Sequence, residues 1–134
     1  MVFFSKHISV SVPASADKVY AFVSDPMNLP KWAAGLSGSI QKKGDDWVAE
    51  SSMGQIKIKF ADKNTFGVLD HDVTLPSGET FYNPMRVFQN GEGCEVVFTL
   101  YLHPGQSDQQ FLEDEIAVAK DLRTLKTLLE KKEE

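Results

Sequence analysis

The segment Ile8–Trp32 constrains the fold of this chain more than any other part of the sequence. An alternating strand pattern runs directly into a short amphipathic helix, a proline break and a second short helix that ends in an aromatic residue. The other end of the chain carries one long amphipathic helix, and a run of strands precedes it. Together the two ends predict a curved sheet wrapped around a helix, with an enclosed space between them.

Strands are predicted wherever apolar and polar residues alternate, because side chains in a strand point to opposite faces. The first strand covers residues 4–12, and Pro13 ends it. Six further strands are predicted over residues 36–42, 46–51, 55–60, 66–75, 79–89 and 93–103. Asn90-Gly91 is a strong hairpin signal, since both central residues of a type I′ turn need positive φ. Short turns between consecutive strands imply one antiparallel, seven-stranded sheet.

Two short helices are expected after the first strand. Ser15 is placed to cap a helix over 16–23, in which apolar residues recur at the spacing of one helical face. Pro30 suits the first turn of a second short helix that carries Trp32. The long final helix begins after Ser107, where Ser107 and Gln110 match a capping box, and it runs to about Glu130.

The apolar stripe of this final helix predicts which face it buries. The buried positions are Phe111, Val118, Leu122, Leu125 and Leu129. The last four residues, KKEE, are expected to be a solvated tail. The fold class predicted is therefore α+β, with a long C-terminal helix held by a curved antiparallel sheet.

Composition and charge exclude several classes of protein. A chain of 134 residues with 42% hydrophobic and 25% charged residues predicts one globular domain spanning 1–134. The net charge of −5 argues against a nucleic-acid partner, which normally meets a basic face. No stretch approaches the ~20 apolar residues of a membrane span, so membrane insertion is not expected. A single cysteine, Cys94, favours a reducing, cytoplasmic location and is expected to be buried and inert.

The order of elements resembles the helix-grip superfamily, also called SRPBCC or START-like, and in particular its polyketide cyclase/dehydrase-like branch. The resemblance covers the whole chain. The residues that carry it are Val10-Ser11-Val12-Pro13-Ala14-Ser15, Val19-Tyr20-Ala21-Phe22, Asp25-Pro26, Leu29-Pro30-Lys31-Trp32, Phe98-Thr99-Leu100 and Pro104-Gly105. These residues specify a fold rather than an activity, because the superfamily contains binders, transfer proteins, cyclases and partner-binding modules.

The resemblance implies a ligand cavity between the sheet and the final helix. The residues expected to line it are Trp32, Met53, Phe60, His71, Arg86, Phe98, Phe111, Glu115, Val118 and Leu122. Trp32 is expected either to cover the mouth as a lid or to belong to the core. No metal is expected, because neighbouring strand residues such as Asp70, His71 and Asp72 cannot converge on one ion. No cofactor is expected either.

Three polar residues are candidates for chemistry, and each has two interpretations. Glu115 lies within the apolar stripe and either enters the cavity or bends out to water. His71 shares a face with Leu69 and Val73, and is either a hydrogen-bonded core group or a cavity group. Arg86 either points outward to pair with a carboxylate or points inward to pair with Glu115 or a ligand. His71 and Glu115 are the weak candidates for catalysis.

Three functions remain open from the sequence. The first is binding or transfer of a small apolar or aromatic molecule, which the abundance of Phe favours. The second is an enzyme of cyclase, dehydratase or hydrolase type that uses His71 and Glu115. The third is a protein-partner module similar to chaperone activators, and a cavity collapsed by Phe side chains would favour it. A homodimer is possible through a strand edge or an exposed Phe cluster.

Overall fold

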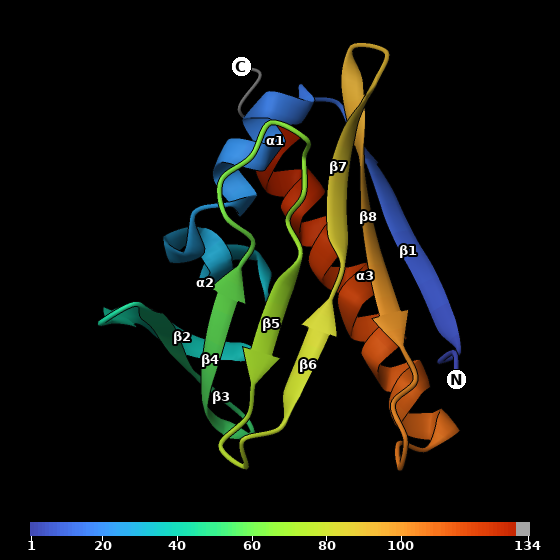
Figure 1. Ribbon diagram of the computed structural model, residues 1–134. Helices are drawn as coiled ribbons and strands as arrows, with labels where there is room; N and C mark the ends of the chain where they lie inside the picture. The colour runs from blue at the N-terminus through green and yellow to red at the C-terminus, as the bar shows by residue number, and fades with distance from the viewer. Residues whose placement is uncertain (131–134) are drawn as a thin grey trace.

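The computed structural model describes residues 1–130, and the predicted tail 131–134 lies outside the described residues (Figure 1). The helices are α1 (Ala16–Val23), the 3-10 turn η1 (Pro26–Asn28), α2 (Leu29–Trp32) and α3 (Asp108–Glu130). The strands are β1 (Ser5–Val12), β2 (Leu36–Lys43), β3 (Asp46–Ser51), β4 (Gly54–Phe60), β5 (His71–Thr74), β6 (Thr80–Asn83), β7 (Met85–Asn90) and β8 (Gly93–Tyr101).

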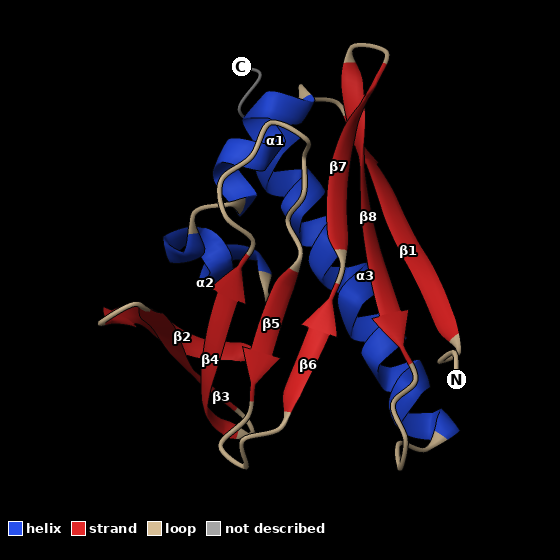
Figure 2. Ribbon diagram, in the orientation of Figure 1, coloured by secondary structure: helices blue, strands red, loops and turns tan. Residues whose placement is uncertain are grey.

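Within residues 1–130 the strands form two antiparallel sheets (Figure 2), so the predicted single seven-stranded sheet is wrong. One sheet has three strands in the order β1-β8-β7, and the other has five in the order β2-β3-β4-β5-β6. The predicted strand 79–89 is divided at Pro84 into β6 and β7, which belong to different sheets. Proline has no N–H to donate to a neighbouring strand, so it suits the point where the chain leaves one sheet for the other.

The division at Pro84 makes β6 diverge from β8. Strand β7 pairs with β8 from the hairpin Asn90↔Gly93 down to Met85↔Phe98, and the Thr99 N–H donates to the Pro84 carbonyl at 2.9 Å. Below this point β6 pairs with β5 instead, in a register that places Val73 opposite Phe81. The gap between β6 and β8 is therefore a direct consequence of the change of sheet.

The predicted strand 66–75 is also shorter than expected, because only His71–Thr74 joins the sheet as β5. The preceding loop follows β7 through an isolated bridge between Val68 and Arg86 and a 2.8 Å hydrogen bond from Leu69 N–H to the Met85 carbonyl. These bonds connect the loop that precedes β5 of the five-stranded sheet to β7 of the three-stranded sheet.

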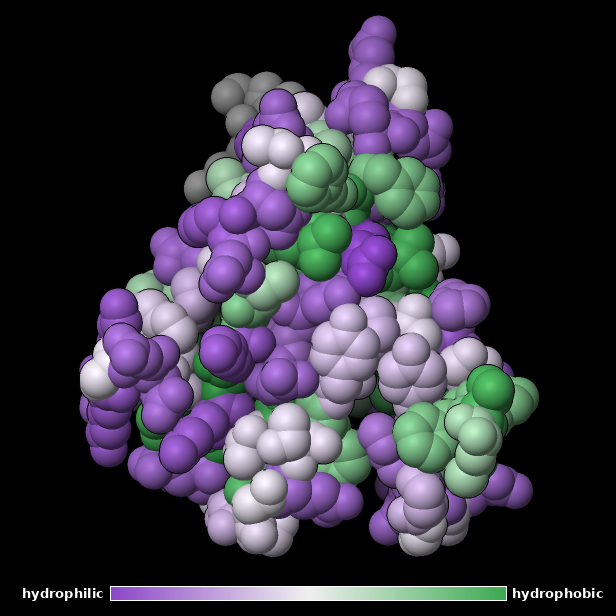
Figure 3. All heavy atoms as spheres, viewed as in Figure 1, coloured by the Kyte–Doolittle hydropathy of each residue, from purple (hydrophilic) through white to green (hydrophobic). Residues whose placement is uncertain are grey.

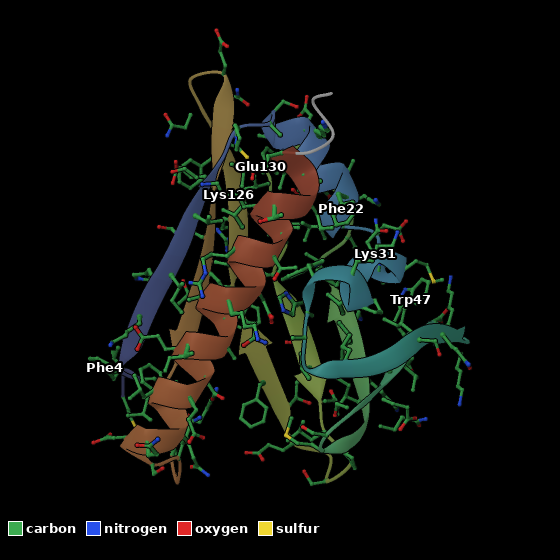
Figure 4. All side chains as sticks on the ribbon, turned by 180° about the vertical axis from the view of Figure 1, so that it is seen from behind. Phe4, Phe22, Lys31, Trp47, Lys126 and Glu130 are labelled. Atoms are coloured by element: carbon green, nitrogen blue, oxygen red, sulfur yellow. The ribbon has the colours of Figure 1, made fainter. Side chains whose placement is uncertain are left out.

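Helix α3 packs along the three-stranded sheet and across α2 (Figure 4). Its buried residues are Phe111, Leu122, Leu125 and Leu129, which confirms most of the predicted stripe. The predicted capping box is present: the Ser107 hydroxyl accepts from Gln110 N–H at 3.1 Å, and the Gln110 side chain accepts from Ser107 N–H at 2.9 Å. Ser15 caps α1 as predicted, since its hydroxyl accepts from Lys18 N–H. Within residues 1–130, no helix has the length and apolar character needed to cross a membrane.

Candidate functional site: a cavity between the sheets and α3

A cavity of about 570 Å³ opens where β6 diverges from β8, and the first half of α3 closes its other side. Its apolar wall comes from the β5–β6 hairpin, β8 and α3, and the residues are Val73, Leu75, Phe81, Phe98, Leu100, Ala117 and Val118. The space-filling view shows the surface hollowed between the β6 side and the β8 side (Figure 3). The splayed strands thus leave a space of the size typical of small-molecule sites.

Polar side chains are distributed around this apolar wall. The carboxylates are Glu79, Glu113, Asp114 and Asp121, and the neutral polar residues are Asn83, Tyr101, His103, Gln106 and Gln110. Three of the carboxylates are exposed, whereas Asp121 is half-buried. Such an arrangement of apolar wall and few polar groups can hold an apolar body and orient its polar end.

Neighbouring groups hold the acidic side chains of α3 in place. The Gln106 side-chain amide donates to Asp114 at 2.7 Å, and the Gln109 amide donates to Glu113 at 3.1 Å. Asp121 accepts from the Ala34 backbone N–H at 3.1 Å. Burial raises the pKa of Asp121, because removal from water disfavours the charged form.

The imidazole of His103 lies on the cavity wall among aromatic rings. Its ring centroid is 4.6 Å from that of Phe81, in an edge-on arrangement, and 6.5 Å from that of Tyr101. The Phe3 ring, which does not line the cavity, lies 5.9 Å from the His103 ring. Aromatic pairs of this geometry are favourable, so these contacts stabilise the position of the His103 ring.

Three of the residues predicted to line the cavity do so: Met53, Phe98 and Val118. Trp32, Phe111 and Leu122 are instead buried in the hydrophobic core, and Phe60 packs against it. Trp32 is therefore a core residue and not a lid, and its indole N–H has no acceptor among the described residues. Whether any of the predicted residues binds a ligand stays a prediction.

His71 is a hydrogen-bonded core group and does not line the cavity. Its ring lies between Phe60, at 4.9 Å, and Phe98, at 5.9 Å, and its Nδ1 is 3.0 Å from the Leu69 carbonyl. Burial lowers the pKa of His71, so the neutral imidazole is favoured. Phe98 separates His71 from the cavity, since it contacts the imidazole and also lines the cavity.

Glu115 and Arg86 both lie outside the cavity. Glu115 faces β1, as its place in the helical stripe predicts, but it pairs there with Lys6 at 3.0 Å. Arg86 points to the outer face of β7 and pairs with Asp70, so its inward alternative is wrong. The structure therefore does not bring His71, Glu115 and Arg86 together, and a catalytic site built from His71 and Glu115 has no geometric support.

Two other reactive side chains, Cys94 and Asp70, also lie outside the cavity lining. Cys94 is buried as predicted, and burial raises the pKa of its thiol. Asp70 and His71 point in different directions, one to Arg86 and the other into the core. Among the described residues, no three His, Cys, Asp or Glu side chains are grouped so that they could hold a metal ion.

The sequence reasoning missed the polar stripe of α3 that lines the cavity. Gln110, Asp114, Ala117 and Asp121 follow one another at i, i+4, i+7 and i+11, which places them on one helical face. This stripe lies beside the apolar one, and its spacing is the signal that identifies it. Tyr101 is the last residue of β8 and pairs with Ser5, and His103 lies two residues beyond the strand, so the apolar alternation of β8 did not identify either residue.

The fold and the cavity together define a helix-grip protein, in which a long C-terminal helix closes a space against antiparallel strands. A family described as polyketide cyclase/dehydrase and lipid transport matches residues 5–130, and the chain belongs to this family. A comparison with curated proteins found no match.

Solved structures share this fold at low sequence identity. The Zhui aromatase/cyclase from Streptomyces sp. R1128 is 16% identical, with a TM-score of 0.75 over 99% of this chain and 97% of that one. The KanY protein is 15% identical, with a TM-score of 0.74 over 97% and 99% of the two chains. DynU16, from the dynemicin biosynthetic locus, is 19% identical with a TM-score of 0.71. The match covers 94% of this chain but only 47% of DynU16, so this chain spans about half of its length.

Proposed function

We propose that this protein binds a small apolar or aromatic molecule in the cavity between β6, β8 and α3. The observation that carries the proposal is the cavity itself, with a volume of about 570 Å³, an apolar wall and a polar rim. This volume lies within the roughly 300–1,000 Å³ of typical small-molecule sites. Membership of a family that includes lipid transport supports the same conclusion. An open cavity favours this function over a partner-binding module with a collapsed interior.

Titration with a fluorescent ring compound, pyrenemethanol, tests the proposal. Two substitutions on α3 provide a matched pair, because both add an indole to the same helix at adjacent positions. Ala117→Trp narrows the cavity, since Ala117 lines it. Ile116→Trp is the control, because Ile116 is 59% exposed and does not line the cavity.

The proposed site predicts different results for the two variants. Wild type and Ile116→Trp should bind pyrenemethanol with similar affinity, and Ala117→Trp should lose at least about tenfold, equivalent to 1.4 kcal/mol. Thermal unfolding midpoints of the free variants check that both remain folded. Equal binding by all three proteins, or no binding by wild type, would contradict the proposed site.

A second candidate function is acid–base catalysis in the same cavity, and the position of His103 favours it. An imidazole on a cavity wall can act as a general acid or a general base, and cyclisation and dehydration both need proton transfer. A synthetic poly-β-ketone thioester, followed by mass spectrometry, provides the test. Catalysis predicts a cyclised product with wild type and none with His103→Gln, provided that the variant still binds pyrenemethanol. Equal product with both proteins would contradict a role for His103.

A further inference from the structure

The charged side chains that line the cavity are all of one sign. They are Glu79, Glu113, Asp114 and Asp121, and no Lys or Arg of the described residues lines the cavity. The hydrogen bonds to the three α3 carboxylates come from neutral donors: two Gln side chains and one backbone N–H. Within the described part of the chain, none of the four carboxylates forms an ion pair with Lys or Arg. A ligand in the cavity would therefore lie near these carboxylates, with no Lys or Arg of the described residues lining the cavity beside it.

The start of α3 does not offset this charge with an anion site. Unpaired N–H groups at a helix start attract anions. Here the Ser107 hydroxyl accepts from Gln110 N–H, and Asp108, Glu113 and Asp114 lie in the first two turns. A ligand carboxylate at this end of the cavity would meet these acidic side chains before it met a free N–H group.

Asp121 is the carboxylate best placed to select a cation. It is the half-buried member of the four, and charges removed from water interact more strongly than exposed ones. One of its oxygens accepts from Ala34 N–H at 3.1 Å, and the other accepts no hydrogen bond from the described residues. The rings of Phe81 and Tyr101 line the same cavity, and aromatic faces also attract cations.

We propose that the cavity takes a ligand with an apolar, ring-containing body and a protonated amine, and that it discriminates against the corresponding carboxylic acid. This inference rests on the proposed function, because it concerns the same cavity. Asp121 is the main partner of the amine, and Glu113 and Asp114 add a weaker attraction that salt screens.

Three compounds with one ring system test the charge preference. Pyrenemethylamine is a cation at pH 7, pyrenemethanol is neutral and pyrenecarboxylic acid is an anion. We expect wild type to bind the amine most tightly and the acid most weakly, with about tenfold or more between the two. We also expect this ratio to shrink between low salt and roughly 0.5 M salt.

Charge-neutralising variants identify the carboxylates responsible. Asp121→Asn keeps an oxygen for the Ala34 N–H, so we expect it to remain folded and to lose about tenfold in affinity for the amine. The double variant Glu113→Gln/Asp114→Asn should lose less. Glu92→Gln is the matched control, because it removes one charge at the β7–β8 turn and Glu92 does not line the cavity. Glu92→Gln should leave the affinities for pyrenemethylamine and for pyrenemethanol within about twofold of wild type.

The results separate this inference from the proposed function. Equal binding of the three compounds, tightest binding of the acid, or an equal loss in Glu92→Gln and Asp121→Asn would overturn the charge preference. In those cases the proposed function stands as long as Ala117→Trp still blocks pyrenemethanol. If none of the compounds binds wild type, both proposals fail.

Discussion

Asp70 and Arg86 join the two sheets through two hydrogen bonds of 2.8 Å each, from Nε and Nη2 of the guanidinium to the two carboxylate oxygens. Asp70 immediately precedes β5 of the five-stranded sheet, and Arg86 lies in β7 of the three-stranded sheet. Asp70 also accepts from the Met85 N–H at 2.9 Å and from the Tyr82 hydroxyl. One carboxylate therefore fixes the segment on both sides of Pro84, where β6 departs from β8 and the cavity begins.

Removal of the Asp70 carboxylate should destabilise the fold. Asp70→Ala leaves the buried Met85 N–H and the Arg86 guanidinium without their acceptor, at a cost of about 2–3 kcal/mol in the free energy of unfolding. Urea unfolding followed by circular dichroism measures this loss. Asp72→Ala is the control, because the Asp72 carboxylate makes no hydrogen bond or ion pair with any described residue, and it should change stability by less than about 0.5 kcal/mol. Equal losses in both variants would contradict the proposed role of Asp70.

The same carboxylate should make stability depend on acid pH. The hydrogen bonds from Arg86 lower the pKa of Asp70 from 3.8 to about 2. The native state therefore binds this proton less readily than the unfolded chain, so the stabilisation is complete above about pH 4 and disappears as pH falls toward 2. Urea unfolding between pH 6 and pH 2 should show that the difference between wild type and Asp70→Asn shrinks over this window. A constant difference would contradict the assignment.

His71 should contribute a second pH dependence, near neutrality. Burial lowers its pKa below the ordinary value of 6.5, so the unfolded chain binds a proton more readily than the native state does. The stabilisation is present above pH 6.5 and is lost as pH falls below it. We expect the thermal midpoint of wild type to drop between pH 7.5 and pH 5.5, and that of His71→Phe to drop less. His7→Gln is the control, because it removes an exposed imidazole, and its thermal midpoint should drop as much as that of wild type. If the drop disappeared in His7→Gln and remained in His71→Phe, the role of His71 would be refuted.

Gly67 is required where the loop before β5 meets β7. Its φ is +73°, and a Cβ would lie 2.0 Å from the Val87 carbonyl oxygen. The Gly67 carbonyl also accepts from Val87 N–H at 2.9 Å, so the loop cannot retreat without breaking this bond. Gly67→Ala should cost at least about 2 kcal/mol in unfolding free energy. Gly91→Ala, at φ +60° with open space around it, should cost only about 1 kcal/mol, and the reverse order would contradict this argument.

The sequence predicted the helices and their caps well, because these depend on local signals such as Ser15 and the Ser107/Gln110 box. The sequence did not predict that the strand is divided at Pro84, because the inward-facing residues alternate in the same way on both sides of the proline: Phe81, Met85 and Val87. The alternation of apolar and polar residues predicts which face of a strand is inward, but it does not predict to which sheet the strand belongs.

The candidate site was predicted less well for a related reason. An inward-facing residue belongs either to the packed core or to the cavity, and periodicity does not distinguish the two. His71 and Phe98 both face inward, yet only Phe98 lines the cavity, because the space opens below the last β7–β8 pair. The divergence of β6 from β8 sets the position of the cavity, and it arises from tertiary pairing.

Amide chemical shifts in ¹⁵N-labelled protein locate bound pyrenemethanol directly. We expect the largest changes around Phe81, Tyr101, His103 and Ala117, with small changes at Trp32 and other core residues remote from the cavity. A second, smaller groove of about 360 Å³, lined by Tyr20, Phe66 and Phe88 among others, provides the competing location. Changes centred on that groove, with none around the cavity between β6, β8 and α3, would contradict ligand binding in the cavity.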